Sequence, residues 1–283
     1  MHTGDPLVST AWLEDHLSAP DVRIVDGSWH LPPEGRDARA EYRQSHIPGA
    51  VFFDIDEICD ETNPLPHMLP HPVKFSARMR KLGLGDGSRI VVYDSKGLFS
   101  AARVWWMLRV MGHDDVVVLD GGLPKWIAEG RPIEDLPPPP RERHFTVRFD
   151  SALIRSVDEV MRDLETGKEQ VVDARPAARF EGREPEPRPG VRSGHIPGSR
   201  SLPWETLVGP DGALLQADAL AQKFATAGVD PARPVVTTCG SGVSAAILAL
   251  ALARLGYWRT PVYDGSWAEW GSREDLPVAT GAA

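Results

Sequence analysis

The sequence predicts an α/β protein built from two tandem copies of one domain, each a mainly parallel sheet with helices on both faces. Short valine- and isoleucine-rich runs alternate with segments that are apolar at helical spacing. Four motifs of the first half recur in the same order in the second half. A chain of 283 residues also has room for two domains of average size, each with a full core.

The repeat consists of four pairs of segments. "VRIVDGSW" pairs with "EQVVDARP", and "HIPG" occurs at both 46–49 and 195–198. "RIVVYDSKGLFSA" pairs with "RPVVTTCGSGVSA", so Asp94 stands where the second copy has Cys239. The last pair is "VVLDGG" and "PVYDGS". Matches in one common order indicate a duplicated domain rather than chance similarity.

Single elements follow from the same patterns. The runs "IVVY" (90–93), "VVVL" (116–119) and "PVVTT" (234–238) are typical of strands buried on both faces of a parallel sheet. "SAARVWWMLRVMG" (100–112) and "SAAILALALARLG" (244–256) predict helices that stop at glycine. Strand and helix in repeated alternation predict right-handed crossovers, with the ligand site at the carboxyl ends of the strands.

A proline-rich stretch separates the copies. Residues 137–140 are consecutive prolines, which cannot join a helix or a central strand and favour an extended chain. We therefore predict a first domain at 1–136, a linker at 137–150 and a second, catalytic domain at 151–283.

Composition narrows the possible partners. The 31 basic and 40 acidic side chains give a net charge of -9, and no basic stripe for nucleic acid is present. No apolar run approaches the roughly 18 residues of a membrane span, and the start "MHTGDPLVSTAWLEDH" does not resemble a secretion signal. We expect a cytoplasmic monomer with no nucleic-acid or membrane partner.

The two cysteines have different surroundings. Cys59 and Cys239 form no C-x-x-C pair, so neither a disulfide nor a metal is indicated, and no cofactor is expected. We interpret Cys59 as a buried structural residue. Cys239 lies between a strand and a helix, where Gly240 and Gly242 allow successive N–H groups to surround the sulfur and the helix dipole favours negative charge. Both effects favour the thiolate, which makes Cys239 a candidate nucleophile.

These features resemble the rhodanese family of two-domain sulfurtransferases over nearly the whole chain. The loop "CGSGVSA" is similar to the CGSGVTA of its 3-mercaptopyruvate branch, and Ser244 keeps the hydroxyl of the usual threonine. Thiosulfate-specific members carry a basic loop resembling CRKGVTA. The resemblance implies transfer of sulfur from 3-mercaptopyruvate, through a Cys239 persulfide, to cyanide or a thiol such as thioredoxin or a small thiol. Thiosulfate as donor, or a non-catalytic persulfide carrier, is the alternative.

The resemblance also implies residue roles. "FFDIDEICDETNPLPHMLP" resembles the segment that supplies an Asp and a His to a relay with Ser, and "RFEGREPEPR" resembles the segment that binds the substrate carboxylate. Catalytic roles are thus implied for Cys239, Ser241, His67 and Asp56, and substrate-binding roles for Arg179, Arg188, Gly240, Gly242, Val243 and Ser244. Without the resemblance, the arginines read as solvated charges on a loop that also holds Glu181, Glu184 and Glu186, and His67 could equally be a surface histidine.

The remaining motifs favour structural roles or exclude a rival. His46 and His195, each before Ile-Pro-Gly, are expected to bond nearby backbone, and Asp120 and Asp264 are expected to be turn residues. Trp29 is expected either to wall the pocket from the first domain or to lie in the core. Phosphatases share the cysteine loop but need an arginine in C-x-x-x-x-x-R, where this chain has Ala245.

Overall fold

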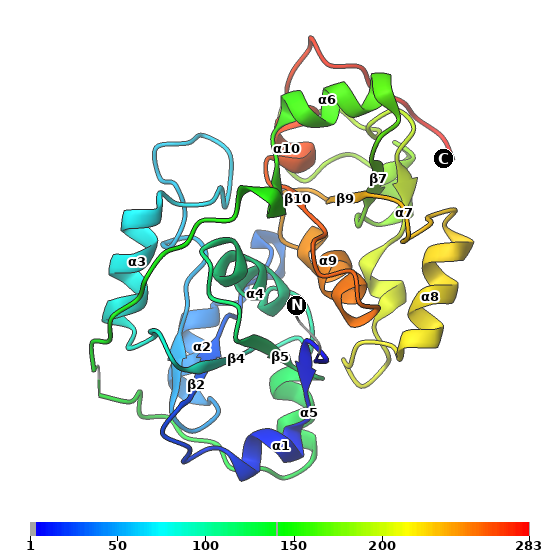
Figure 1. The fold of residues 1–283 in the computed structure, drawn as a ribbon. Helices are drawn as coiled ribbons and strands as arrows, with labels where there is room; N and C mark the ends of the chain where they lie inside the picture. Colours follow the sequence, from blue (N-terminus) through cyan, green and yellow to red (C-terminus); the bar gives the residue numbers. More distant parts are fainter. Residues whose placement is uncertain (1–3, 140, 283) are drawn as a thin grey trace.

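The computed structural model describes residues 4–139 and 141–282, which form two five-stranded parallel sheets (Figure 1). The strand order is β1-β5-β4-β2-β3 in the first sheet and β6-β10-β9-β7-β8 in the second. The two sheets have the same strand order, with β6 to β10 in the places of β1 to β5. The predicted fold class and duplication are therefore confirmed.

The first sheet comprises β1 (Leu7–Val8), β2 (Val22–Asp26), β3 (Ala50–Phe52), β4 (Arg89–Tyr93) and β5 (Val116–Leu119). Its helices are α1 (Thr10–Asp15), α2 (Ala38–Gln44), α3 (Pro72–Lys81), α4 (Ala101–Val110) and α5 (Gly122–Ala128), with a 3₁₀ turn at Pro32–Glu34. The alternation of strands and helices follows the predicted pattern.

The second sheet comprises β6 (Ile154–Arg155), β7 (Gln170–Asp173), β8 (Arg200–Ser201), β9 (Val235–Thr238) and β10 (Val262–Tyr263). Its helices are α6 (Val157–Thr166), α7 (Ala177–Phe180), α8 (Ala217–Thr226), α9 (Ala245–Arg254) and α10 (Ser266–Trp270). Two 3₁₀ turns, Ser151–Leu153 and Trp204–Leu207, complete this half.

Helices α4 and α9 lie between the two sheets and pack against each other (Figure 1). Every residue of α4 is buried, and every residue of α9 except Arg254 is buried. Both helices stop before a glycine of positive φ, Gly112 at 85° and Gly256 at 93°, as their sequences predict. One hydrophobic cluster includes both helices, so the core crosses from one half to the other. This packing places loops of the first half beside the cysteine loop of the second.

The connection between the halves is extended and lies on the first of them. Residues 141–150 contain neither helix nor strand. The Arg148 N–H donates to the Met111 carbonyl at 2.9 Å, and the Phe145 ring packs 5.7 Å from that of Phe75. Pro140, the last of the four prolines, lies outside the described residues.

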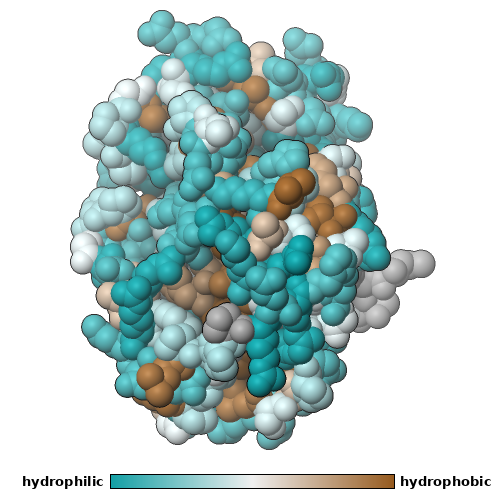
Figure 2. Space-filling model, turned by 90° about the vertical axis from the view of Figure 1, so that its left-hand side faces the viewer, coloured by the Kyte–Doolittle hydropathy of each residue, from teal (hydrophilic) through white to brown (hydrophobic). Residues whose placement is uncertain are grey.

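The face of the molecule in Figure 2 is mainly hydrophilic, and its hydrophobic residues form small, separate patches. Among the helices of the described chain, none has both the length and the apolar character of a membrane span.

Candidate active site

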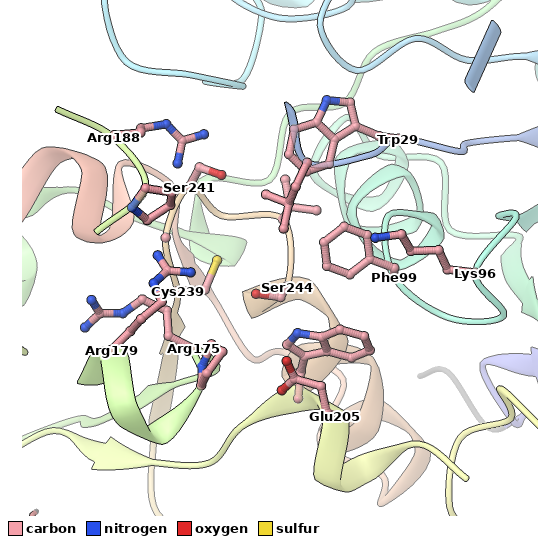
Figure 3. Close-up of a pocket in the computed structure, with 16 residues that line it drawn as sticks. Trp29, Lys96, Phe99, Arg175, Arg179, Arg188, Glu205, Cys239, Ser241 and Ser244 are labelled. Atoms are coloured by element: carbon pink, nitrogen blue, oxygen red, sulfur yellow. The ribbon is translucent and has the colours of Figure 1, made fainter. Parts of the chain in front are cut away.

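Cys239 is the first residue after β9, at the carboxyl edge of the second sheet. It is 2% exposed, and its sulfur points into a pocket (Figure 3). The Cys239 carbonyl accepts a hydrogen bond from the Trp267 N–H at 2.9 Å, and the Gly240 carbonyl accepts one from the Ala268 N–H at 2.8 Å. Backbone N–H groups of α10 therefore satisfy the hydrogen bonding of two carbonyls of the loop.

The N–H groups of the loop remain available to a ligand. Within the described chain, none of the N–H groups of residues 240–244 donates a hydrogen bond to another group of the protein. Gly242 has a φ of 75°, and a Cβ there would lie 2.8 Å from Arg103 Nη1, so the loop requires glycine at this position. Helix α9 begins at Ala245 and adds its positive end. Such a loop is suited to bind an anion.

The pocket above the sulfur is small and lies between the two halves, with a cavity volume of about 120 Å³. The first half contributes Trp29, Leu31, Lys96 and Phe99. The second half contributes Arg175, Pro176, Arg179, Pro187, Arg188, Trp204, Glu205, Cys239, Gly240, Ser241, Val243 and Ser244 (Figure 3). Of the implied substrate-binding residues, only Gly242 lies outside the lining, beneath the loop against Arg103.

The arginines beside the sulfur differ in their partners. Arg188 has no hydrogen bond or ion pair with any described residue, so its charge faces the pocket unpaired. Burial lowers the pKa of its guanidinium, and the nearby Cys239 opposes that shift. Arg179 donates through Nε and Nη2 to the carboxylate of Glu186. Arg188 is therefore the better placed of the two to receive a substrate carboxylate.

Glu186, which belongs to the same acidic loop as the two arginines, has a buried side chain. Its side chain is 4% exposed, and Oε1 lies 2.7 Å from Arg175 Nη1. Arg175 is itself buried, with Nη2 2.7 Å from Asp173 Oδ2. A chain of ion pairs thus fixes Arg179 at the pocket. Sequence reasoning missed Arg175 and Glu186, although Arg175 lies just beyond β7, which is the neighbour of β9 and ends at the same edge of the sheet.

The structure brings two of the three implied relay residues together. His67 Nδ1 lies 2.9 Å from Asp56 Oδ1, and the Trp29 indole N–H donates to Asp56 Oδ2 at 2.9 Å. Partial burial raises the pKa of the Asp56 carboxyl, but the hydrogen bonds from His67 and Trp29 and the charges of His67 and Arg188 together leave that pKa lowered. His67 Nε2 is buried without a hydrogen-bond partner, and no hydrogen bond joins it to Ser241, which lines the pocket. Trp29 lies between the relay pair and the pocket, with its ring 4.8 Å from that of His67.

Three further residues singled out in the sequence, Cys59, His46 and His195, lie outside the pocket. The Cys59 thiol is buried and donates to the Asp56 carbonyl at 2.9 Å, and burial raises its pKa. The prediction for the two motif histidines is confirmed: His46 Nδ1 lies 2.6 Å from the Tyr42 carbonyl, and His195 Nδ1 lies 2.8 Å from that of Phe180.

Asp264 lies in the bend after β10, as its motif predicts, but it also has a role that the motif does not indicate. Its side chain is 5% exposed and forms an ion pair with Arg103 of the other half, 2.6 Å away. The matching Asp120 accepts a hydrogen bond from the Leu214 N–H at 2.8 Å, which also crosses between the halves. Both aspartates therefore hold the two halves together, a role that a turn motif read in one copy does not reveal.

Two α/β domains share one pocket, and a cysteine lies in that pocket at a strand-to-helix loop, an arrangement suited to an enzyme that forms a covalent cysteine intermediate. The Rhodanese-like domain family matches residues 9–129 and 156–273. The chain belongs to this rhodanese family, and it is a sulfurtransferase.

Two curated relatives match the chain over almost their full length. The chain is 44% identical to the 3-mercaptopyruvate sulfurtransferase of Escherichia coli (strain K12) over 272 residues, which cover 96% of each chain. It is 41% identical to the thiosulfate sulfurtransferase of Gallus gallus over 273 residues, 94% of this chain and 93% of that one. The crystal structure of SseA from Escherichia coli, described as a 3-mercaptopyruvate sulfotransferase, matches with a TM-score of 0.86 and 40% identity over 93% of this chain and 99% of that one.

Proposed function

We propose that this enzyme takes sulfur from 3-mercaptopyruvate through a persulfide on Cys239. The Cys239 thiolate attacks the substrate sulfur, the carbon–sulfur bond breaks, and its electron pair leaves with pyruvate as the enolate, which is then protonated. An acceptor thiol or cyanide attacks the outer sulfur and restores the Cys239 thiolate. The observation that carries this proposal is the loop beside Cys239, whose N–H groups at 240–244 are unpaired within the described chain and suited to a sulfur anion.

The charges around the pocket favour a mercapto acid over thiosulfate. The loop itself carries no cation, since Gly240 and Ser241 follow Cys239. Arg188 offers one unpaired guanidinium for a single carboxylate. Glu205 also lines the pocket, where burial raises the pKa of its carboxyl; whether charged or neutral, this group offers no positive charge to the second negative charge of a thiosulfate dianion.

Proton transfer is assigned to the hydroxyl that lines the pocket. Ser241 can donate a proton to the leaving enolate or take one from the acceptor thiol. His67, oriented by Asp56, is the group that would exchange that proton with Ser241. This step requires His67 Nε2 or Ser241 Oγ to turn toward the other, because no hydrogen bond joins them.

The acceptor and the cellular setting are part of the same proposal. A small pocket that opens between the halves suits a small thiol, cyanide or the exposed thiol of a thioredoxin-like protein. We propose that the protein is a monomer, because the two domains of one chain already form the pocket together. We also propose a cytoplasmic location, where an unpaired catalytic thiol stays reduced.

Two measurements on the purified enzyme test this function. A mass spectrum after mixing with 3-mercaptopyruvate should show one added sulfur atom on the peptide that contains Cys239, with pyruvate released. Cys239→Ser should lose turnover at least about 1000-fold, because the nucleophile is gone. Cys59→Ser is the matched control and should keep most of the activity.

The donor is tested by comparing kcat/KM for 3-mercaptopyruvate and thiosulfate with the same acceptor. We expect 3-mercaptopyruvate to be the better donor. A clear preference for thiosulfate would instead support the activity named for the Gallus gallus relative. A persulfide that forms but is never passed on would indicate a sulfur carrier rather than an enzyme.

A further inference from the structure

Arg103, on α4 of the first half, has a fully buried side chain that lies beside the cysteine loop of the second half. Its guanidinium stacks on the Trp106 ring at 4.4 Å. Nη1 forms a buried ion pair with Asp264 Oδ1 at 2.6 Å. A charge buried this deeply must be paired, and its pair comes from the other half of the chain.

The same ion pair fixes the backbone around His67. Arg103 Nη2 donates to the His67 carbonyl, and Asp264 Oδ2 accepts from the Leu69 N–H at 2.8 Å. The segment 67–69 is thus held at both ends. His67 has a φ of 60°, a left-handed conformation that costs free energy in a residue with a Cβ and persists only where neighbours impose it.

Arg103 also contacts the cysteine loop directly. Nη1 donates to the Gly242 carbonyl at 3.3 Å, and a Cβ at Gly242 would come within 2.8 Å of that same nitrogen. One guanidinium therefore contacts the backbone of His67 on one side and the backbone of the loop on the other. No other charged side chain of the described chain donates to both segments.

We propose that Arg103, paired with Asp264, is a positioning residue for sulfur transfer, which sets His67 and the Cys239 loop in register across the domain boundary. This inference rests on the proposed function. Lysine at position 103 would keep the charge but not the planar fork that reaches Asp264, Gly242 and His67 together. A displacement of about 1 Å in a positioned group can reduce a rate about 100-fold.

The experiment measures single-turnover release of pyruvate from 3-mercaptopyruvate, well below the unfolding temperature of each variant. Arg103→Lys should slow release about 10- to 100-fold. Arg109→Lys is the matched control: Arg109 is also buried on α4 and also crosses to the second half, donating to the Trp258 carbonyl at 3.0 Å, but it contacts neither segment of the site. It should lower the unfolding temperature and leave the rate within about twofold.

A double-mutant cycle separates positioning from simple loss of stability. In a His67→Ala background, Arg103→Lys should cost at least about fivefold less than in the wild-type background, because one of the two segments that Arg103 aligns no longer acts. Equal costs in both backgrounds, or equal rate losses in Arg103→Lys and Arg109→Lys, would overturn the inference. If Arg103→Lys fails to fold, Asp264→Asn tests the same pair from the other half. A wild-type enzyme that releases no pyruvate would instead refute the proposed function.

Discussion

The Asp94 loop and the Cys239 loop occupy the same place in the two sheets, and an equivalent backbone hydrogen bond holds the first residue of each loop. The Asp94 carbonyl accepts from the Leu123 N–H at 3.0 Å, as the Cys239 carbonyl accepts from the Trp267 N–H at 2.9 Å. Each loop leads into the buried helix of its half, α4 or α9. The Asp94 loop is one residue longer.

The loops differ in what their N–H groups bind. The carboxylate of Asp94 accepts from the N–H groups of Lys96 at 2.9 Å, Phe99 at 2.6 Å and Ala101 at 2.9 Å. The matching groups at 240–244 donate to no described residue. The first domain thus fills its anion site with its own side chain, whereas the second leaves that site for a ligand. The comparison teaches that a strand-to-helix loop serves stability or chemistry according to which group occupies it.

The largest expected effect comes from removing the Asp94 carboxylate, which accepts hydrogen bonds from the N–H groups of the first loop. Asp94→Ala should lower the free energy of unfolding by about 2 to 5 kcal/mol, because buried N–H groups lose a charged acceptor. Cys239→Ala should change it by less than about 1 kcal/mol, since no loop N–H donates to the sulfur. Urea unfolding of the two variants measures the difference.

Asp94→Asn is the conservative control, since it keeps an acceptor oxygen without the charge, and its loss should lie between those of wild type and Asp94→Ala. If Asp94→Ala were as stable as wild type, the carboxylate would not be what holds the first loop, and the contrast between the two loops would be wrong.

The second effect compares two arginines of the catalytic half. Arg188→Lys should lower kcat/KM for 3-mercaptopyruvate about 10- to 100-fold, because lysine keeps the charge but cannot form the two-point contact with a carboxylate. Arg179→Lys should cost less, since Glu186 already takes part of that guanidinium. Alkylation of Cys239 by iodoacetamide is the control and should change little in either variant. Full activity in both variants would mean that the carboxylate binds elsewhere.

The sequence predicted most of what local patterns encode. The β-branched runs and glycine stops identified β4, β9, α4 and α9, and the repeat identified two equivalent sheets. The glycine-bracketed loop correctly placed Cys239 between β9 and α9 at the edge of a pocket, because the geometry of such a loop depends on neighbouring residues in the chain. These features need no knowledge of how the halves pack.

Contacts between segments far apart in the sequence could not be predicted from local patterns. The Arg103 to Asp264 pair joins a helix of one half to a turn of the other, and neither residue stands in a motif that names its partner. Glu186 stands among charged residues in the sequence, yet tertiary packing buries its side chain between Arg175 and Arg179. Burial and pairing across long sequence separations arise only once the halves are docked.

A second pair of equivalent positions sharpens the comparison between the halves. Asp26 ends β2 and Asp173 ends β7, and both are 1% exposed. Asp173 is paired with Arg175, which follows it by two residues. Asp26 has Ser28 at the corresponding place, which supplies an N–H at 2.9 Å but no positive charge. Burial accordingly raises the pKa of Asp26 from 3.8 to about 6.

The smallest effect is therefore a gain of stability in Asp26→Asn that depends on pH. In the folded protein Asp26 holds its proton up to about pH 6, whereas in the unfolded chain it loses the proton near its ordinary value of 3.8. Ionisation of Asp26 therefore lowers the stability of the wild type progressively as the pH rises from about 4 to about 6, and by a constant amount above that range.

Each unit of pKa difference corresponds to about 1.4 kcal/mol, and asparagine replaces the carboxyl imperfectly. We therefore expect Asp26→Asn to be more stable than wild type by about 1 to 2 kcal/mol at pH 7.5. The gain should vanish below about pH 3, where Asp26 is protonated in both states. The midpoints of urea unfolding, measured across this pH range, test the prediction.

Asp173→Asn is the control. That variant should be destabilised at pH 7.5, because it leaves the buried Arg175 with less counter-charge. If both variants changed stability in the same direction at pH 7.5, the two buried aspartates would not differ in the way that their partners indicate.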